Sequence, residues 1–399
     1  MRKSVFIPGV LIILLTLVSA ACGAESPAVA STPTVASTQP VRTPTLITAS
    51  PSPTAVSAAT ATPVVATATA HAASAATPTP VAATATPVPN PFADVPGIVD
   101  PDNQGWPRTV VGLNGEVVIS QQPTRIHTVS LGHDEVTYAL VPAERVVAVG
   151  TFTQDPIYSN VARLAALVPG IGRQAEQIVA QDPDIVFASP FSRAELIQSL
   201  ENVGITVVQT EIHNDAAGRI QDILFMGYAL GEEARAIELA REVGERYEAL
   251  TLAVKDARQQ SEKPKVLALS FYSDKYYVAG AGATEGAIIE SAGGVNVAAE
   301  AGLTGSPTVS LEGVIAMNPE VIIIPQPANS GGDDLKALLL IDPALSEIPA
   351  VQSGRIYVVS PKFYTTLSFW NLRGAEELAK LLWPGQLGGR EYQPFSFPE

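Results

Sequence analysis

Two glutamates, Glu176 and Glu312, begin two copies of one short phrase in the chain. The first copy reads Glu-Gln-Ile-Val-Ala-Gln-Asp-Pro-Asp-Ile-Val-Phe over residues 176–187, and the second reads Glu-Gly-Val-Ile-Ala-Met-Asn-Pro-Glu-Val-Ile-Ile over residues 312–323. Carboxylates form strong charge-assisted hydrogen bonds with basic side chains. Two glutamates at matching places in two similar lobes could therefore dock the protein onto a two-fold symmetric partner. The alternative is that each glutamate simply occupies the first turn of a helix, where the helix dipole favours an acid.

The chain carries no recognisable catalytic signature. It contains no Gly-x-Ser-x-Gly, His-Glu-x-x-His or Gly-x-x-x-x-Gly-Lys-Ser/Thr motif. Gly280 and Gly282 follow an expected strand, but Glu285 stands where a dinucleotide site has its third glycine. Four histidines and one cysteine supply few of the nitrogen and sulfur ligands that zinc prefers. We expect a binding protein with no catalytic residue, metal site or intrinsic cofactor, and a secreted hydrolase is a remote alternative.

Each glutamate phrase also predicts its own local structure. The amphipathic stretch indicates a short helix, the proline ends it, and the β-branched run indicates a buried strand. Strands and helices alternate around both copies, which favours α/β lobes with parallel sheets. Apolar residues that recur every three or four positions predict one long helix between the lobes. The expected domains are an N-terminal lobe over 105–230, a connecting helix over 231–262 and a C-terminal lobe over 263–399.

Residues 1–22 have the pattern of a secretory signal peptide. A basic start is followed by an apolar run from Val5 to Val18 and by small residues directly before Cys22. The position of Cys22 resembles that of the lipidated cysteine in a bacterial lipobox, although Ser19 replaces the usual leucine. We therefore expect an extracytoplasmic protein that is lipid-anchored to the cell membrane through Cys22. The alternative is ordinary signal cleavage that leaves Cys22 as a free thiol.

The composition of residues 23–104 predicts a disordered tether. Ala, Thr, Pro, Ser and Val dominate this segment, and its only charges before residue 90 are Glu25 and Arg42. Such a segment cannot bury enough surface to offset its chain entropy. The whole chain has 24 basic and 39 acidic residues, a net charge of −15, which argues against a nucleic-acid partner. We expect an acidic, monomeric head on a flexible stalk.

Several longer phrases in the two halves carry a further signal. They are Arg125-Ile-His-Thr-Val-Ser-Leu131, Tyr138-Ala-Leu140, Arg145-Val-Val-Ala-Val-Gly150, Tyr277-Val-Ala-Gly-Ala-Gly-Ala-Thr284, Ile289-Glu-Ser-Ala-Gly-Gly-Val-Asn-Val297 and Val309-Ser-Leu-Glu312. Together they resemble the Fe/B12-type substrate-binding proteins of bacterial ABC importers. The resemblance implies a class III periplasmic binding protein fold, with two Rossmann-like lobes joined by a single long helix. It also implies that Glu176 and Glu312 contact arginine pockets on a permease dimer, which works with an ATPase.

The same resemblance implies a ferric siderophore, cobalamin or haem as cargo, held in a cleft between the lobes. Ligand contacts are expected in loops at the carboxyl ends of the strands. The candidates are His133, Thr151, Phe152, Phe191 and Arg193 in the first lobe and Tyr272, Gln326 and Tyr364 in the second. The aromatic rings suit a large flat ligand, and Arg193 could pair with its carboxylates. Any one of these aromatics could instead be ordinary packing, and Arg193 could be a surface residue.

A haem site would also need a side chain that ligates the iron, which an imidazole or a tyrosinate can do. His133 and the phenols Tyr158, Tyr272 and Tyr364 are the candidates, although a histidine beside a helix start is also a common cap or surface residue. We expect the substrate-binding component of an ABC importer for a ferric siderophore or a corrinoid. A haem-binding member of the same family is one alternative, and a surface-tethered sensor or adhesion module is another.

Overall fold

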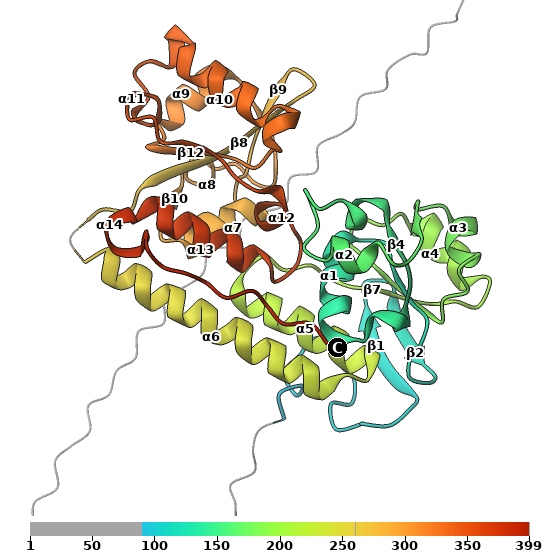
Figure 1. The fold of residues 1–399 in the computed structure, drawn as a ribbon. Helices are drawn as coiled ribbons and strands as arrows, with labels where there is room; N and C mark the ends of the chain where they lie inside the picture. The colour runs from blue at the N-terminus through green and yellow to red at the C-terminus, as the bar shows by residue number, and fades with distance from the viewer. Residues whose placement is uncertain (1–89, 260, 399) are drawn as a thin grey trace, which may run out of the picture. The chain divides into compact units, whose positions relative to one another are not determined.

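A computed structural model of the chain describes residues 90–259 and 261–398. The expected signal peptide, the expected lipidation site Cys22 and the expected tether up to residue 89 lie outside the described residues. The described part forms two α/β lobes, which Figure 1 shows on the same side of the long helix α6 (Glu233–Ala257). None of the helices in the described part is long and apolar enough to cross a bilayer.

The N-terminal lobe contains a parallel sheet in the order β5-β4-β3-β6-β7. These strands span Gly170–Ile171, Val146–Gly150, Ile126–Thr128, Ile185–Ala188 and Thr206–Gln209. One face is covered by α1 (Leu131–Leu140) and α5 (Ala216–Leu230), and the other by α3 (Ala175–Val179) and α4 (Ala194–Glu201). An antiparallel hairpin, β1 (Arg108–Gly112) with β2 (Gly115–Ile119), precedes the sheet, and the short α2 (Ala162–Ala165) follows β4.

The C-terminal lobe contains a mixed sheet in the order β11-β9-β8-β12-β13, with β10 also paired to β8. The strands span Thr308–Val309, Lys275–Val278, Lys265–Tyr272, Val321–Ile324, Ile356–Val358 and, for β10, Val295–Asn296. Helices α7 (Thr284–Ser291) and α13 (Asn371–Leu382) pack on one face, and α9 (Leu311–Met317) and α10 (Gly332–Ile341) on the other. The shorter helices are α8 (Val297–Glu300), α11 (Pro349–Gln352), α12 (Pro361–Tyr364) and α14 (Pro384–Leu387).

The two glutamate phrases fold in the same way, as the sequence predicts. Each is a short helix, a residue in the left-handed region, a proline and a fully buried strand. The left-handed residues are Asp182, with φ 49°, and Asn318, with φ 47°. The acid after each proline then holds the start of the neighbouring strand. Asp184 Oδ2 accepts a hydrogen bond from the backbone N–H of Arg125 at 3.1 Å, and Glu320 Oε2 accepts one from that of Lys265 at 3.0 Å.

The long helix α6 has 25 residues and is about 37 Å long at the usual rise per residue. It packs antiparallel to α5, which ends at Gly231 with φ 72°, a conformation that suits glycine. The two helices approach closely where Gly227 faces Ala236, because a Cβ on Gly227 would lie only 2.1 Å from the Cβ of Ala236. The predicted connecting helix is therefore one half of a helical hairpin.

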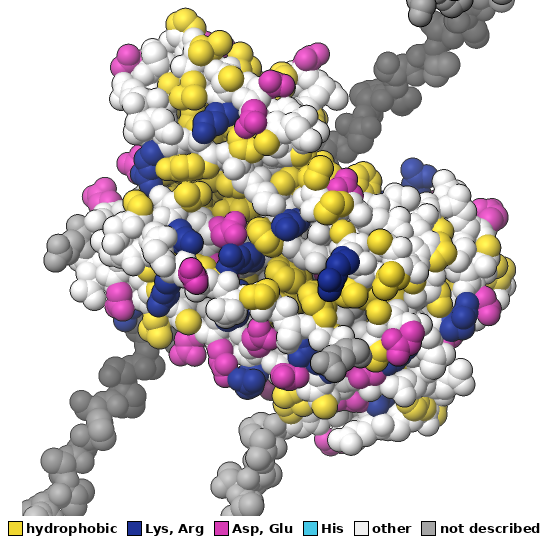
Figure 2. Space-filling model, in the orientation of Figure 1, with side chains coloured by type: hydrophobic (Ala, Val, Ile, Leu, Met, Phe, Trp, Pro, Cys, Tyr) yellow, Lys and Arg dark blue, Asp and Glu magenta, His cyan; other side chains and the backbone are white. Residues whose placement is uncertain are grey.

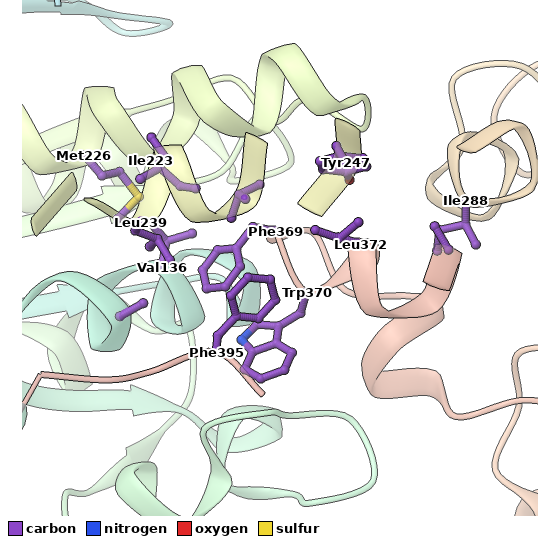
Figure 3. Close-up of a cluster of buried hydrophobic side chains, with 14 of the residues drawn as sticks. Val136, Ile223, Met226, Leu239, Tyr247, Ile288, Phe369, Trp370, Leu372 and Phe395 are labelled. Carbon is purple, nitrogen blue, oxygen red and sulfur yellow. The ribbon is translucent and has the colours of Figure 1, made fainter. Parts of the chain in front are cut away.

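One continuous hydrophobic core joins the two lobes. It includes Val136 of α1, Ile223 of α5 and Ile288 of α7, so it passes from the first lobe through the hairpin into the second. Figure 3 shows Phe369, Trp370 and Phe395 at its centre, close to α1 and α6. Phe395 belongs to the C-terminal segment, which Figure 1 shows returning along α6 to the N-terminal lobe. The described fold therefore has a second connection besides α6.

The folded part begins earlier than the boundary expected at residue 105. Phe92 and Val95 are each only 5% exposed and belong to the continuous core. Phe92 packs on the ring of Tyr228 in α5, with 6.2 Å between ring centroids. The backbone N–H of Val111 donates to the carbonyl of Gly97 at 2.7 Å, which ties this segment to β1. Residues 90–104 therefore belong to the N-terminal lobe and not to the tether.

Candidate functional site

The largest cavity described lies at the carboxyl ends of β3, β4 and β6, where the loop at residues 365–367 of the C-terminal lobe approaches them. Its volume is about 670 Å³. The lining residues are His127, Thr128, Val129, Ser130, Leu131, Gly132, Gly150, Thr151, Phe152, Thr153, Tyr158, Ile171, Gly172, Arg173, Ser189, Phe191, Thr365, Thr366 and Leu367. Loops that leave neighbouring parallel strands meet at this edge of a sheet, so the fold itself gathers these side chains.

A second cavity of about 280 Å³ covers the facing wall of the C-terminal lobe. It is lined by Ala268, Ser270, Tyr272, Tyr277, Val278, Ala279, Glu285, Ser306, Pro325 and Thr365. Thr365 lines both cavities, so the two adjoin at this residue, one on each lobe. We call this combined space the interlobe cleft.

Exposed aromatic rings mark the N-terminal wall of the interlobe cleft. Phe152 is 65% exposed and Phe191 is 76% exposed. Phe152 meets Tyr158 edge to face, with 5.8 Å between ring centroids. Rings left in solvent at a strand end provide flat apolar area that a ligand can cover.

The floor of the interlobe cleft is held by a buried carboxylate. Asp134 Oδ1 accepts a hydrogen bond from Thr128 Oγ1 at 2.7 Å, and its Oδ2 accepts one from Thr153 Oγ1 at 2.6 Å. Burial raises the pKa of Asp134 to about 7, although these hydrogen bonds oppose the shift. Both threonines line the cleft but are fully buried, so their hydroxyls serve to hold the Asp134 carboxylate.

The C-terminal wall carries the titratable groups of the cleft. Burial raises the pKa of Glu285 to about 6. Burial also raises the pKa of Tyr272, and the nearby Tyr158 phenol adds to that shift. Tyr158 and Tyr272 come from opposite lobes, and each lines one of the two cavities of the cleft.

The positive charge at the cleft comes from a residue that the sequence did not single out. Arg173 is exposed and lines the 670 Å³ cavity. It also lines an adjoining cavity of about 330 Å³, together with Phe191 and Arg193. Arg173 follows β5, a strand of only two residues. Two residues cannot show the alternation of apolar and polar side chains by which a strand is recognised in a sequence, so the sequence did not place Arg173 at a strand end.

Five of the eight expected ligand residues lie in or beside the interlobe cleft. Thr151, Phe152 and Phe191 line its larger cavity, Tyr272 lines the facing cavity, and Arg193 lines the adjoining one. Their side chains come from the strand-end loops, as the sequence predicts for a two-lobed α/β fold.

The structure does not bring the other three into the cleft. The side-chain amide of Gln326 bonds to both the backbone N–H and the carbonyl of Phe271, at 2.8 and 3.0 Å, so it braces the end of β8. Tyr364 is only 1% exposed in the continuous core, and burial raises its pKa well above the usual range. His133 lines a different cavity, and its Nε2 lies 2.6 Å from Thr210 Oγ1.

A buried polar network ties the two lobes at the base of the cleft. The Glu135 carboxylate, on α1, accepts hydrogen bonds from Thr366 Oγ1 and Ser368 Oγ of the C-terminal lobe, each at 2.5 Å. It also accepts bonds from the backbone N–H and side-chain amide of Asn160, both at 2.8 Å. The Asn160 amide donates in turn to the carbonyl of Lys362 at 2.8 Å. The loop that closes the cleft is therefore anchored to the opposite lobe.

Glu176 and Glu312 lie outside the cleft, in the first turns of α3 and α9. Both side chains are exposed, and neither takes part in an ion pair within residues 90–259 and 261–398. A hydrogen bond with Ser310 lowers the pKa of Glu312. Figure 1 shows α3 and α9 in different lobes, both away from α6.

The described residues contain no group of three or more His, Cys, Asp or Glu side chains placed to hold a metal ion. His127 lines the larger cavity, but it is 1% exposed, and its Nδ1 lies 2.9 Å from the carbonyl of Ala148. The cleft thus offers aromatic faces, hydroxyls and an arginine to a ligand.

Comparison with known proteins agrees with this architecture. Residues 126–362 match the family described as periplasmic binding protein. The uncharacterized ABC transporter substrate-binding lipoprotein YvrC of Bacillus subtilis is 26% identical over 274 residues, which cover 68% of this chain and 83% of that protein. A cobalamin-binding protein of Halobacterium salinarum is 27% identical over 249 residues, covering 62% of this chain and 66% of that one. The solved apo form of the periplasmic heme-binding protein RhuT from Roseiflexus sp. RS-1 is 26% identical, with a TM-score of 0.57 over 65% of this chain and 98% of that one.

Proposed function

The chain belongs to the periplasmic binding protein family, and we propose that it is the extracytoplasmic substrate-binding component of an ABC importer for a large metal chelate. The observation that carries this proposal is the interlobe cleft, whose main cavity of about 670 Å³ combines exposed phenyl rings, hydroxyls and Arg173. A planar or bulky chelate such as a corrinoid or a ferric siderophore can stack on the rings and place its oxygens at the arginine. The protein would bind its cargo without performing chemistry on it.

Absorption titrations of the purified protein test the cargo. We expect saturable binding of cyanocobalamin, or of a ferric catecholate or hydroxamate siderophore, with a shift of the chromophore spectrum. Phe191→Ala should weaken that binding by about tenfold, because it removes an exposed ring from the cleft. Leu167→Ala is the matched control, since Leu167 is 75% exposed and lines none of the described cavities. If none of the chelates, haem included, binds saturably, the cargo assignment is wrong.

Haem is the second candidate cargo, and the facing phenols of Tyr158 and Tyr272 favour it. A tyrosinate from either lobe can ligate ferric iron. Haem bound in this way should give a shifted Soret band that Tyr272→Phe or Tyr158→Phe alters and Tyr277→Phe leaves in place. A Soret shift that survives the first two substitutions would exclude phenolate ligation at these residues.

The partner and the anchor are part of the same proposal. Exposed carboxylates in the first turns of α3 and α9 can each accept charge-assisted hydrogen bonds from a permease subunit, and the permease then delivers the cargo under the action of its ATPase. We further propose that the protein acts as a monomer held at the membrane surface by a lipid on Cys22. Incorporation of a labelled fatty acid, which Cys22→Ser should abolish, tests the anchor.

A further inference from the structure

A separate cavity of about 190 Å³ lies in the N-terminal lobe, between the segment before β1, the start of α1 and helix α5. Its walls are mostly apolar, with Val95, Val111, Val136, Phe225, Met226 and Leu367 among them. Figure 3 shows Val136 and Met226 on neighbouring helices beside Leu239. At its rim Leu113 is 47% exposed and Glu211 is exposed, so the cavity can be reached from solvent.

This cavity is distinct from the interlobe cleft. Gly132 and Leu367 line both spaces and form the wall between them. A Cβ on Gly132 would lie 2.7 Å from the carbonyl oxygen of Leu367, so the two backbones are in contact there. The buried Arg219 fixes this wall further by donating a hydrogen bond to the same carbonyl.

His133 gives the apolar cavity one polar group without a partner. The imidazole is 6% exposed, and its Nε2 lies 2.6 Å from Thr210 Oγ1. Its Nδ1 is buried and has no hydrogen-bond partner among the described residues. Burial and the positive charge of Arg219 lower the pKa of His133 to about 4, so the ring is neutral at pH 7. We assign the ring proton to Nε2, which then donates to Thr210 Oγ1. In this tautomer Nδ1 is a hydrogen-bond acceptor, and no donor in the described part of the chain faces it.

We propose that this cavity is a binding site for a small aromatic molecule with one hydrogen-bond donor, of the size and kind of a phenol. An apolar cavity of about 150 Å³ is enough to hold benzene, and the space here is slightly larger. Nδ1 is shielded from solvent, so a small shift of the surrounding side chains must accompany binding. The hydroxyl of a phenol can then donate to Nδ1 of His133, which removes the cost of a buried unpaired acceptor. The ring then packs against the apolar walls, whose buried members include Val136, Phe225 and Met226.

Methionine-methyl NMR on the full chain tests both the binding and its location. The sequence has three methionines, Met1, Met226 and Met317. Met226 lines the proposed site, whereas Met317 lies in α9 of the other lobe. Titration with phenol should shift the Met226 methyl resonance saturably and leave that of Met317 in place. An unshifted Met226 resonance at millimolar phenol, or equal linear shifts of both, would overturn the proposal.

A comparison of phenol with toluene, which has the same shape but no donor, tests the hydrogen bond. His133→Phe should lower the phenol-to-toluene affinity ratio by roughly three- to tenfold, the worth of one such bond. An unchanged ratio would contradict the assigned donor. Should this variant fail to fold, the 15N signal of His133 Nδ1 in the wild-type protein gives the same information: phenol should shift it and toluene should not. Phe191→Ala is the control, and a loss of phenol binding there would place the phenol in the interlobe cleft instead.

Discussion

Asp134 is the titratable residue that holds the floor of the interlobe cleft through its hydrogen bonds. Its carboxylate receives the hydroxyls of Thr128 and Thr153, and burial raises its pKa to about 7. In the unfolded chain the same carboxyl has a pKa near 4. The folded protein therefore keeps this proton to a higher pH than the unfolded chain does.

The expected consequence is a fall in stability as pH rises from about 4 to about 7. In that window the folded state binds more protons than the unfolded state, so each pH unit lowers the free energy of unfolding, by at most about 1.4 kcal/mol for one group. Asp134→Asn should flatten this dependence, as measured by urea unfolding at pH 5 and pH 7. Asp333→Asn, at an exposed acid of α10, is the control and should leave the slope unchanged. An equal slope in wild type and Asp134→Asn would contradict the role of Asp134.

Part of the candidate site could be predicted from aromatic residues near the ends of expected strands. The rest could not, because the sequence does not show which side chains are buried. Phe152 and Phe191 follow strands, Tyr272 is the last residue of β8, and all three lie in the cleft, because strand ends converge in this fold. Tyr364 also follows a strand, yet the short helix α12 turns it into the core. Asp134 stands in the first turn of α1, where an acid is common, and only the structure shows both threonines against it.

At the scale of elements, the close packing of α5 on α6 rests on Gly227 of α5, whereas Gly244 of α6 has more open surroundings. A Cβ at Gly227 would meet the Cβ of Ala236 at 2.1 Å, whereas one at Gly244 would meet only Ile220 Cδ1, at 3.4 Å. Gly227→Ala should destabilise the protein by about 1–3 kcal/mol through overpacking. Gly244→Ala is the matched control and should stabilise it by about 0.5–1 kcal/mol through helix propensity. Urea midpoints compare the two, and equal changes would contradict the tight contact.

The short helices α3 and α9 carry the prediction about the permease. Glu176→Arg with Glu312→Arg should abolish cargo uptake, or the stimulation of the transporter ATPase by the loaded protein, and leave cargo affinity unchanged. Reversal of charge places like charges in contact at both docking points. The control is Glu248→Arg with Glu290→Arg, which makes the same change in net charge at exposed sites on α6 and α7. Uptake that survives the first pair, or is lost equally with the control pair, would contradict docking through these glutamates.

Helices and strands that are marked by their own residues could be predicted from the sequence. Elements that exist only through contacts with distant parts of the chain could not. The helix, proline and strand of each glutamate phrase follow from the order of residues, and both copies fold as predicted. The two-residue strands β5 and β10 exist only through pairing with β4 and β8. Residues 90–104 have the composition of a linker, and the burial of Phe92 depends on Tyr228, over 100 positions away in the sequence.

At the scale of the molecule, the lobes share one core and are tied by the Glu135 network, so they are built to move little. Such a structure should unfold in a single cooperative transition, because neither lobe can lose its packing alone. It should also close only slightly on cargo. Coincident near-UV and far-UV circular dichroism transitions would support this, and two separated transitions would contradict it.

Phe395 gives the sharpest test of that shared core. Its ring is 3% exposed, lies 4.8 Å from the ring of Phe369 and 5.0 Å from that of Trp370, and has the Arg246 guanidinium 4.0 Å from its centroid. Phe395→Ala should lower the free energy of unfolding by about 3–5 kcal/mol. Because Arg246 lies on α6 and Trp370 precedes α13, the whole transition should shift to lower urea as one step.

Phe397→Ala is the matched control for the same C-terminal segment. Phe397 is only partly buried, and its ring centroid is 6.2 Å from that of Trp370, so its removal should cost clearly less. A Phe395→Ala protein whose N-terminal and C-terminal lobes unfold at different urea concentrations would show that the C-terminal segment stabilises one lobe only. A single shifted transition would instead mean that the C-terminal segment around Phe395 helps to hold both walls of the cleft at a fixed separation, as a protein that captures cargo with little closure requires.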